Sequence, residues 1–397
     1  VLCARGWLRN SQFTLACQTV LLMGSRNPPK KSFFIVANPD SVERVMSVSV
    51  RSPTCQIALH TSTGRAVFSD ILSTMQHPYI WPIVQADYIQ ESQKAVVVRP
   101  LAPKGSLKDL IYKTKDPKGS YSAKYVGLGS PIPERQIMQF GRQILEAMAF
   151  MERKGFPCLS LHTGNIMMNK SQTTCHISDH ENTLLGLRPF YADYFLEGHD
   201  PCVLSFGHVM YEMAVGQPLA SRLPPDTIQC VQSVGNIIEA IFRPNEASAK
   251  LTVKDLLSTP FFAGVKLRDG EPAAIRFDSD CKKALKKIRH ALADGVMDDG
   301  TCDPGLPPVK EKKKKRDRTA DGPAAIAAPP EAAPAAAAAP APAPAAAAPA
   351  PPPPPPAGGP PPPPPPGPAP KIAVAMPAPP QAGRSDMLAD IRKLRIE

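Results

Sequence analysis

No apolar run in the 397-residue sequence reaches the roughly 18–20 residues that a membrane-spanning helix needs. The first residues, Val1–Trp7, are too short for a signal peptide and are interrupted by Arg5. The nine cysteines are odd in number and contain no C-x-x-C pair, which argues against a disulfide framework and a zinc knuckle. These absences favour a reducing, cytoplasmic setting, and because the chain starts at Val1 rather than Met, we expect sequence upstream.

Proline and basic charge are concentrated in the last quarter of the chain. Of the 49 prolines, 28 lie in the 93 residues from Gly305 onward. The same residues carry +5 of the formal net charge of +11, much of it in Lys312–Arg318. Such a run attracts phosphates or an anionic membrane, or serves as a nuclear import signal, and a solvated linker boundary is an equal alternative. The remaining +6 is too mild to indicate a partner, so no DNA binding is expected.

The proline-rich tail has an order of its own. Alanine/proline repeats lead to two proline runs, at 351–356 and 360–366. Such sequences favour the extended polyproline II helix, which profilin and SH3- or WW-type domains bind at a low entropic cost. A spacer without a dedicated partner is the alternative.

Short apolar runs indicate β structure up to about residue 98, and helical periodicity follows. The expected strands contain Thr19–Met23, Phe33–Val36, Met46–Val50 and Ala95–Val98, and the expected helices cover about 67–75, 134–154, 206–213 and 234–241. The sequence therefore predicts a small β-rich lobe followed by a larger helical lobe.

The order of motifs in this body resembles the protein kinase fold. Val96–Leu101 resembles the last strand of the N-lobe and the hinge, Gly105–Leu110 the helix that follows, and Leu251–Phe262 the C-terminal kinase signature. The resemblance implies an α+β, two-lobed kinase-like fold with a disordered proline-rich tail. The expected parts are an N-lobe over 1–98, a C-lobe over 99–265, a C-terminal helical extension over 266–304, a basic and then Ala/Pro-rich linker over 305–383, and a terminal helix over 384–397.

Phosphoryl transfer in kinases needs a general base and metal-binding Asn and Asp residues. The pattern H-R-D-L-x-x-x-N aligns with residues 158–165, which keep Asn165 but have Ser160 in place of the base. A serine hydroxyl does not accept a proton near neutral pH. The D-F-G triplet aligns with 179–181, where Asp179 is kept and Glu181 replaces the glycine. We therefore assign no catalytic residue.

The other parts of a kinase site are also missing from the sequence. No G-x-G-x-x-G precedes the hinge, and no A-P-E follows Asp179. The strand lysine is best matched by Arg51, and Phe68 stands where its glutamate partner should lie, with Asp70 two residues away. The resemblance leaves residual nucleotide binding open, with ATP at Arg51, Leu101, Asn165 and Asp179 and Mg²⁺ at Asn165 and Asp179.

Six segments narrow the resemblance to PX domain-containing kinase-like and slowpoke-binding proteins, both kinase-like with degenerate sites. They are Gln76–Ile80, Lys104–Tyr112, Gly141–Glu146, Lys154–Pro157, Glu181–Leu187 and Phe206–Met213. The resemblance implies a pseudokinase scaffold, peripheral to a membrane, that binds a membrane protein or ion channel and 14-3-3 proteins. In that family a PX domain precedes the kinase-like body, and none is visible here. A weakly active ATP-dependent serine/threonine kinase and a tail-driven actin regulator are the alternatives.

Residues 384–397 resemble the helix of a WASP-homology actin-binding motif. Met387, Leu388 and Ile391 fall on one helical face that suits an apolar cleft, and Arg384 precedes them. The downstream part of the motif is shortened to Lys393–Glu397. The sequence therefore predicts actin binding through this segment, with a generic amphipathic helix as the alternative.

Overall fold

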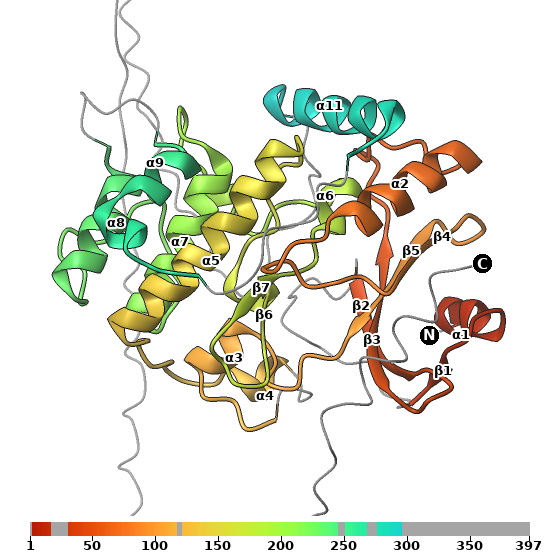
Figure 1. Cartoon of the computed structure of the whole chain (residues 1–397), viewed down its shortest axis with the longest axis horizontal. Coiled ribbons are helices and arrows are strands. Elements are labelled where there is room, and N and C mark those ends of the chain that lie inside the picture. The colour runs from red at the N-terminus through yellow and green to blue at the C-terminus, as the bar shows by residue number, and fades with distance from the viewer. Residues whose placement is uncertain (1, 17–30, 117–120, 245–250, 268–275, 296–397) are drawn as a thin grey trace, which may run out of the picture. The chain divides into compact units, whose positions relative to one another are not determined.

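The computed structural model of the chain describes residues 2–16, 31–116, 121–244, 251–267 and 276–295 (Figure 1). All of them belong to the first of two compact units, Val1–Arg316 and Asp317–Glu397. The predicted linker over 305–383, the basic run Lys312–Arg318, and the terminal helix over 384–397 with Arg384, Met387, Leu388 and Ile391 lie outside the described residues.

The N-lobe is built on a five-stranded antiparallel sheet with the order β1-β2-β3-β5-β4. Its strands are β1 (Thr14–Leu15), β2 (Lys31–Ala37), β3 (Glu43–Val50), β4 (Gln85–Ile89) and β5 (Lys94–Pro100). The predicted strands in the second, third and fourth apolar runs are confirmed, and Thr19–Met23 lies outside the described residues. Helix α2 (Ser62–Thr74) connects β3 to β4 and contains the helix expected at 67–75.

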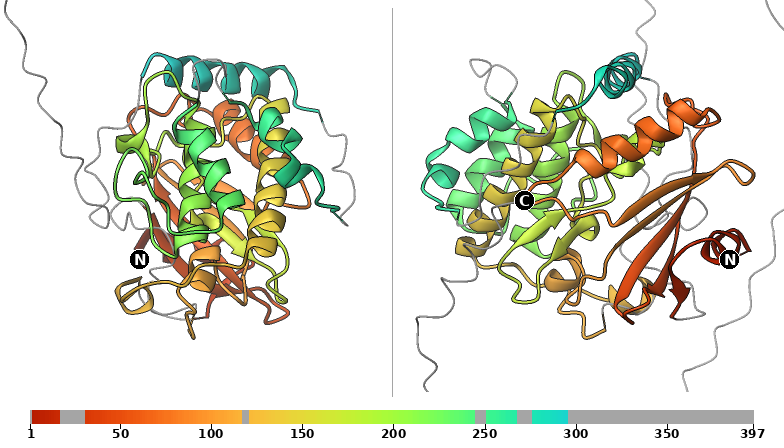
Figure 2. Two further views of the ribbon diagram at one scale, coloured as in Figure 1. Left: turned by 90° about the vertical axis from the view of Figure 1, so that its left-hand side faces the viewer. Right: turned by 45° about the vertical axis from the view of Figure 1, so that its right-hand side comes forward.

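The two faces of this sheet have different partners, because successive side chains of a strand point to opposite sides. On one face Phe34, Met46 and Val96 pack against helix α1 (Leu2–Arg9) through Ala4 and Trp7. The other face carries Phe33 and Val97 and is turned toward the C-lobe (Figure 2). Helix α1 is absent from the sequence-based expectations, since its eight residues span little more than two turns.

The C-lobe is mainly helical and is organised around helix α5. Its helices are α3 (Leu107–Ile111), α4 (Tyr121–Lys124), α5 (Glu134–Arg153), α6 (Glu181–Leu184), α7 (Pro201–Val215), α8 (Gln232–Phe242), α9 (Val253–Ser258), α10 (Pro260–Ala263) and α11 (Ser279–Ala293). Two 3₁₀ turns, η1 (Thr163–Asn165) and η2 (Ala192–Tyr194), and a short hairpin, β6 (Ile166–Met168) and β7 (Cys175–Ile177), complete it. The expected helices at 134–154, 206–213 and 234–241 correspond to α5, α7 and α8.

Local signals set the ends of these helices. Asp200 caps α7 by accepting hydrogen bonds from the backbone N–H groups of Cys202 and Val203 at 2.7 and 3.3 Å. The helix ends at Gly216, whose φ is +82° and where a Cβ would lie 2.8 Å from the carbonyl oxygen of Gly129. Glycine is therefore required at that position, as the sequence indicated.

Two short helices are stabilised by capping boxes. Ser106 and Asp109 exchange side-chain and backbone hydrogen bonds at the start of α3, and Thr252 and Asp255 do so at the start of α9. These caps explain how helices of five and six residues form where the kinase-like motifs were recognised. In the part of the chain that the structure describes, no helix combines the length and the apolar character needed to cross a bilayer.

His208 lies within an aromatic cluster inside the C-lobe. Its ring stacks on Tyr191 at 4.2 Å between centroids and meets Phe242 edge-on at 5.2 Å. Neither ring nitrogen has a hydrogen-bond partner among the described residues. Burial lowers the pKa of His208 from 6.5 to about 3, so the folded protein holds this imidazole neutral.

We predict that His208→Phe makes the protein more resistant to acid. The pKa of His208 is lower in the folded protein than its value of 6.5 in the unfolded chain. Below pH 6.5 the unfolded chain therefore binds a proton that the folded protein does not, and the free energy of unfolding falls as pH decreases. Removing it should lessen the drop in unfolding free energy between pH 7.5 and pH 5 by about 2 kcal/mol. Urea denaturation at the two pH values measures this drop, with His60→Phe, at an exposed histidine, as the control. An unchanged drop in His208→Phe would contradict the prediction.

Candidate functional site

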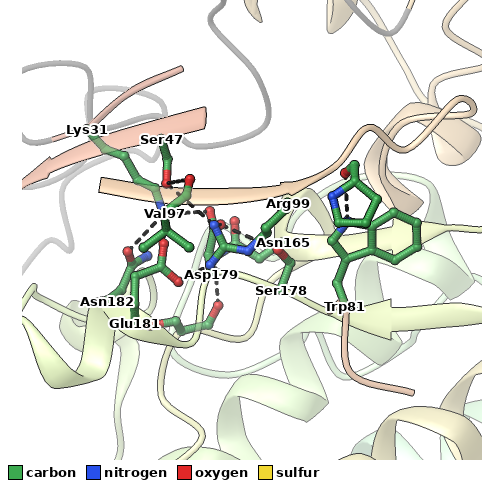
Figure 3. Close-up of polar contacts among 12 residues, drawn as sticks. Lys31, Ser47, Trp81, Val97, Arg99, Asn165, Ser178, Asp179, Glu181 and Asn182 are labelled. Carbon is green, nitrogen blue, oxygen red and sulfur yellow. Dashed lines mark hydrogen bonds and ion pairs between the residues drawn. The ribbon is translucent and has the colours of Figure 1, made fainter. Parts of the chain in front are cut away.

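Four buried charged side chains meet between the two lobes (Figure 3). Lys31 comes from β2 and Arg99 from β5, on the sheet face that is turned toward the C-lobe. Asp179 follows β7, and Glu181 is the first residue of α6. Each of these side chains is no more than 6% exposed. We refer to the four residues as the ion-pair cluster.

Each cation of the cluster contacts both carboxylates. Lys31 Nζ lies 3.1 Å from Asp179 Oδ2 and 2.8 Å from Glu181 Oε1. Arg99 Nη2 donates to Glu181 Oε2, and Arg99 Nη1 lies 3.7 Å from Asp179 Oδ1. Lys31 also donates to Asn182 Oδ1 at 3.1 Å. The charges of the cluster sum to zero, and its contacts join the sheet of one lobe to a loop of the other.

The surroundings keep Glu181 ionised despite its burial. Burial alone would raise the pKa of Glu181, but the Arg99 and Lys31 charges outweigh it and hold that pKa well below its usual range. The pKa of the adjacent His180 is also lowered, to about 4, because burial disfavours the charged imidazolium. At neutral pH the loop therefore presents two carboxylates to the two cations and a neutral imidazole to the core.

Asp179 has an unusual backbone conformation, with φ of +58°. An aspartate tolerates this left-handed region better than most residues, at a modest energetic cost. The backbone N–H of Asn182 donates to the carbonyl oxygen of Asp179 at 3.0 Å, which closes a tight turn between β7 and α6. This turn brings Asp179 and Glu181 to the same two cations.

The strand β3 contributes a serine rather than a cation to this region. Ser47 is buried, and its Oγ lies 3.4 Å from Arg99 Nη1. Arg51, the residue matched to the strand lysine, lies just beyond the end of β3, where its backbone N–H donates to Gln93 O at 3.4 Å. The charge of Arg51 acts on Tyr88 instead. Burial raises the pKa of Tyr88, and Arg51 offsets part of that rise. The structure thus brings Asp179 together with Lys31 and Arg99, and within the described residues Arg51 forms no ion pair with Asp179 or Glu181.

Helix α2 gives no carboxylate to the cluster. Phe68, at the expected glutamate position, is fully buried in the core, and Asp70 is exposed. The role of a glutamate facing the two cations is taken by Glu181, from the other lobe. Sequence reasoning missed Lys31 and Arg99. Lys31 lies on the same side of β2 as Phe33, and Arg99 directly follows the apolar run Val96–Val98. A charged residue at such a position indicates a buried and paired group.

Asn165 and Ser160 lie next to each other in the loop before β6. Asn165 Nδ2 donates to the carbonyl oxygen of Ser160 at 2.9 Å, and the backbone N–H of Ser178 donates to Asn165 O at 2.8 Å. The Oδ1 atom of Asn165 is buried without a partner among the described residues. His162, in the same loop, stacks on Phe190 at 4.4 Å between centroids and accepts a hydrogen bond from the backbone of Gly164.

A second buried ion pair holds this loop against the helices of the C-lobe. Lys108 of α3 pairs with Glu212 of α7, and Thr163 Oγ1 donates to Glu212 Oε2 at 2.7 Å. Lys108 and Glu212 are buried, so the pair is shielded from water. Their contact fixes η1, and with it Asn165, relative to the helical core.

The hinge region surrounds a small pocket. Leu101 is partly buried against Phe33 and its neighbours, and Trp81 Nε1 donates to the carbonyl oxygen of Pro100 at 3.0 Å. The pocket has a volume of about 30 Å³ by a measure in which one water molecule needs roughly 10–15 Å³. Its lining includes Phe33, Val45, Trp81, Arg99, Met167 and Asp179. The space that the described residues leave there is therefore small in this conformation.

The residues present do not fit a bound Mg²⁺–ATP in this conformation. Mg²⁺ prefers six oxygen ligands in near-ideal octahedral geometry. Both oxygens of Asp179 face cations of the cluster, and the described residues contain no group of three or more His, Cys, Asp or Glu side chains that could hold a metal. A metal at Asp179 would have to displace Lys31, and Glu181 would lose one of its two partners.

Comparison with known proteins agrees with the kinase-like architecture. A model of the protein tyrosine and serine/threonine kinase family matches residues 45–183, about a third of the chain. This match and the sheet with its helical lobe confirm the two-lobed kinase-like fold.

Three relatives are similar over much of the chain. The probable inactive serine/threonine-protein kinase slob2 of Dictyostelium discoideum is 32% identical, over 78% of this chain and 55% of its own length. The mouse PX domain-containing protein kinase-like protein is 34% identical, over 58% of this chain and 40% of its own length. The slowpoke-binding protein of Drosophila melanogaster is 29% identical, over 72% of this chain and 61% of its own length. The chain thus covers between two and three fifths of these relatives.

We predict that Glu181→Gln destabilises the protein by about 3–5 kcal/mol, because it leaves two buried cations with one carboxylate. Adding Lys31→Met should recover part of this loss, since Arg99 and Asp179 then remain as a balanced pair. Because the pKa of Glu181 is lowered on folding, its contribution is present above pH about 4.5 and is lost as pH falls.

Urea denaturation at pH 7 measures both variants, with the exposed Glu152→Gln of α5 as the matched control. A loss below about 1 kcal/mol in Glu181→Gln, with no gain on adding Lys31→Met, would show that the cluster does not hold the lobes together.

Proposed function

We propose that this chain, a kinase-like homologue of the PX domain-containing kinase-like and slowpoke-binding proteins, is a pseudokinase scaffold that binds partner proteins instead of transferring phosphate. The observation that carries the proposal is the ion-pair cluster, in which Lys31 and Arg99 occupy the oxygens of Asp179. Ser160 at the base position supports it, because no carboxylate is there to accept a substrate proton. Two relatives named as probable inactive kinases point the same way.

The proposed partners come from two sources. The name of the slowpoke-binding protein supports binding of a membrane protein or ion channel, and family resemblance adds 14-3-3 proteins. The sequence of the tail supports actin through residues 384–397, and profilin or SH3- and WW-type domains through its proline runs. In this proposal the lobes form a fixed body, and the tail adds binding segments.

A weakly active serine/threonine kinase is the second candidate, favoured by the presence of Asn165 and Asp179. Asn165 Oδ1 suits a ligand, since it is buried and has no hydrogen-bond partner among the described residues. This candidate would require the cluster to open, so that Asp179 exchanges Lys31 for a metal.

We predict that Mg²⁺–ATP gives neither a thermal shift nor phosphate transfer with the full chain. Differential scanning fluorimetry with ATP, with and without Mg²⁺, measures binding, and a radiolabelled assay of autophosphorylation and of a generic substrate protein measures transfer. Asn165→Ala is the matched variant, because it changes a family metal ligand that stands outside the ion-pair cluster. Incorporation of label that is lost in Asn165→Ala would contradict the scaffold and establish the kinase.

We predict that removal of residues 384–397 abolishes actin binding by the chain. Co-sedimentation with filamentous actin and a gel-filtration assay with monomeric actin measure it, because WASP-homology-like helices bind an apolar cleft. Leu388→Asp in the full chain should weaken binding as the truncation does, whereas Asp386→Asn, on another side of the expected helix, should not. Equal actin binding by the full and shortened chains would end this part of the proposal.

A further inference from the structure

Helix α11 has a buried face and a basic face. Cys281, Leu285 and Ile288 are buried against the body of the protein, and α11 contacts α2. Figures 1 and 2 show the helix on the outside of the molecule, across α2 and near one end of α5. Its buried stripe fixes the rotation of the helix, and with it the direction of every other side chain.

The exposed side of α11 is strongly basic. Lys282, Lys283, Lys286 and Lys287 are exposed, and at about 100° per residue their spacing places them along one side of the helix. The acidic residue of this helix, Asp280, lies 3.0 Å from Lys283. We refer to the four lysines as the α11 basic face.

The basic face continues beyond these four residues. Arg289 is exposed, and its guanidinium group lies close to Gly155 at the end of α5. Arg153, two residues before that glycine, is also exposed. The positive charge thus extends from the helix to the adjoining edge of the C-lobe, where it forms an elongated surface rather than a single point.

Two properties of this face select its partner. No large apolar side chain of α11 is strongly exposed, so the face offers no anchor for an apolar peptide. It also consists mainly of lysines, which are mobile point charges, whereas arginine forks suit the paired recognition of single phosphates or carboxylates. Mobile point charges on an elongated surface complement many anionic headgroups that are themselves free to move.

We propose that the α11 basic face docks on the surface of a bilayer that contains anionic phospholipids. Each lysine near such a surface strengthens binding about fivefold at physiological salt, and the effect is screened within a Debye length of about 8 Å. This surface lies outside the candidate site and extends the proposed scaffold function, since it would hold the kinase-like body at a membrane. It also differs from the tail run Lys312–Arg318, and the two contributions are separable by mutation.

The test uses the full chain and sedimentation with vesicles of phosphatidylcholine, either alone or with about a third of phosphatidylserine, at low, physiological and high salt. The first variant replaces Lys282, Lys283, Lys286 and Lys287 by Gln. The control replaces Lys104, Lys115, Lys170 and Lys254 by Gln, which removes the same charge from exposed lysines on other elements. A third variant replaces the four lysines 312–315 by Gln.

We expect salt-sensitive binding to the anionic vesicles that falls about 100-fold or more in the α11 variant and less than tenfold in the control. The third variant should retain a part of the binding that is lost when the α11 changes are added. Unfolding midpoints should match in all variants, since the replaced side chains are exposed and glutamine is a good helix former.

Three outcomes would overturn the proposal. The first is equal vesicle binding by the α11 variant and the control. The second is binding that depends on lysines 312–315 alone. The third is tighter binding of the native chain to a soluble polyanion, such as single-stranded RNA or polyglutamate, than to the anionic vesicles, which would assign the face to a different partner.

Discussion

The contacts of Lys31 and Arg99 with Asp179 and Glu181 join the two lobes of this protein through buried charges. The cations belong to the sheet and the carboxylates to a loop of the helical lobe, so separating the lobes would leave charges without partners. Breaking such a buried pair costs far more than its net contribution to folding suggests. The cleft of a kinase-like fold is in this way closed by the chain's own side chains.

Much of the fold follows from the sequence because the signals are local. The apolar period of α5, the proline and aspartate that begin α7 and the glycine that ends it lie within a few residues of what they determine. The candidate site is less accessible to such reasoning. Residue 31 and residue 181 are brought together only by the packing of two lobes, and a pattern search for a lysine on β3 leads to Arg51, which lies at the strand's end.

Glu181 makes the loop after β7 part of the contact between the two lobes. A glycine at this position would leave the loop free, whereas a glutamate takes two cations and makes the loop a structural element. Serine at position 47 of β3 completes the change, since it leaves room for the guanidinium group of Arg99. The charged groups of this region are thus paired with one another within the chain.

The indole of Trp81 has a consequence for chemical probes of this protein. Its Nε1–H occupies a lone pair of the Pro100 carbonyl oxygen, one of the backbone acceptors in the hinge segment. A hinge-directed inhibitor built to donate to that oxygen would compete with an internal donor and meet a pocket of about 30 Å³. Selective ligands for this pocket are therefore to be sought among compounds that displace the Trp81 side chain.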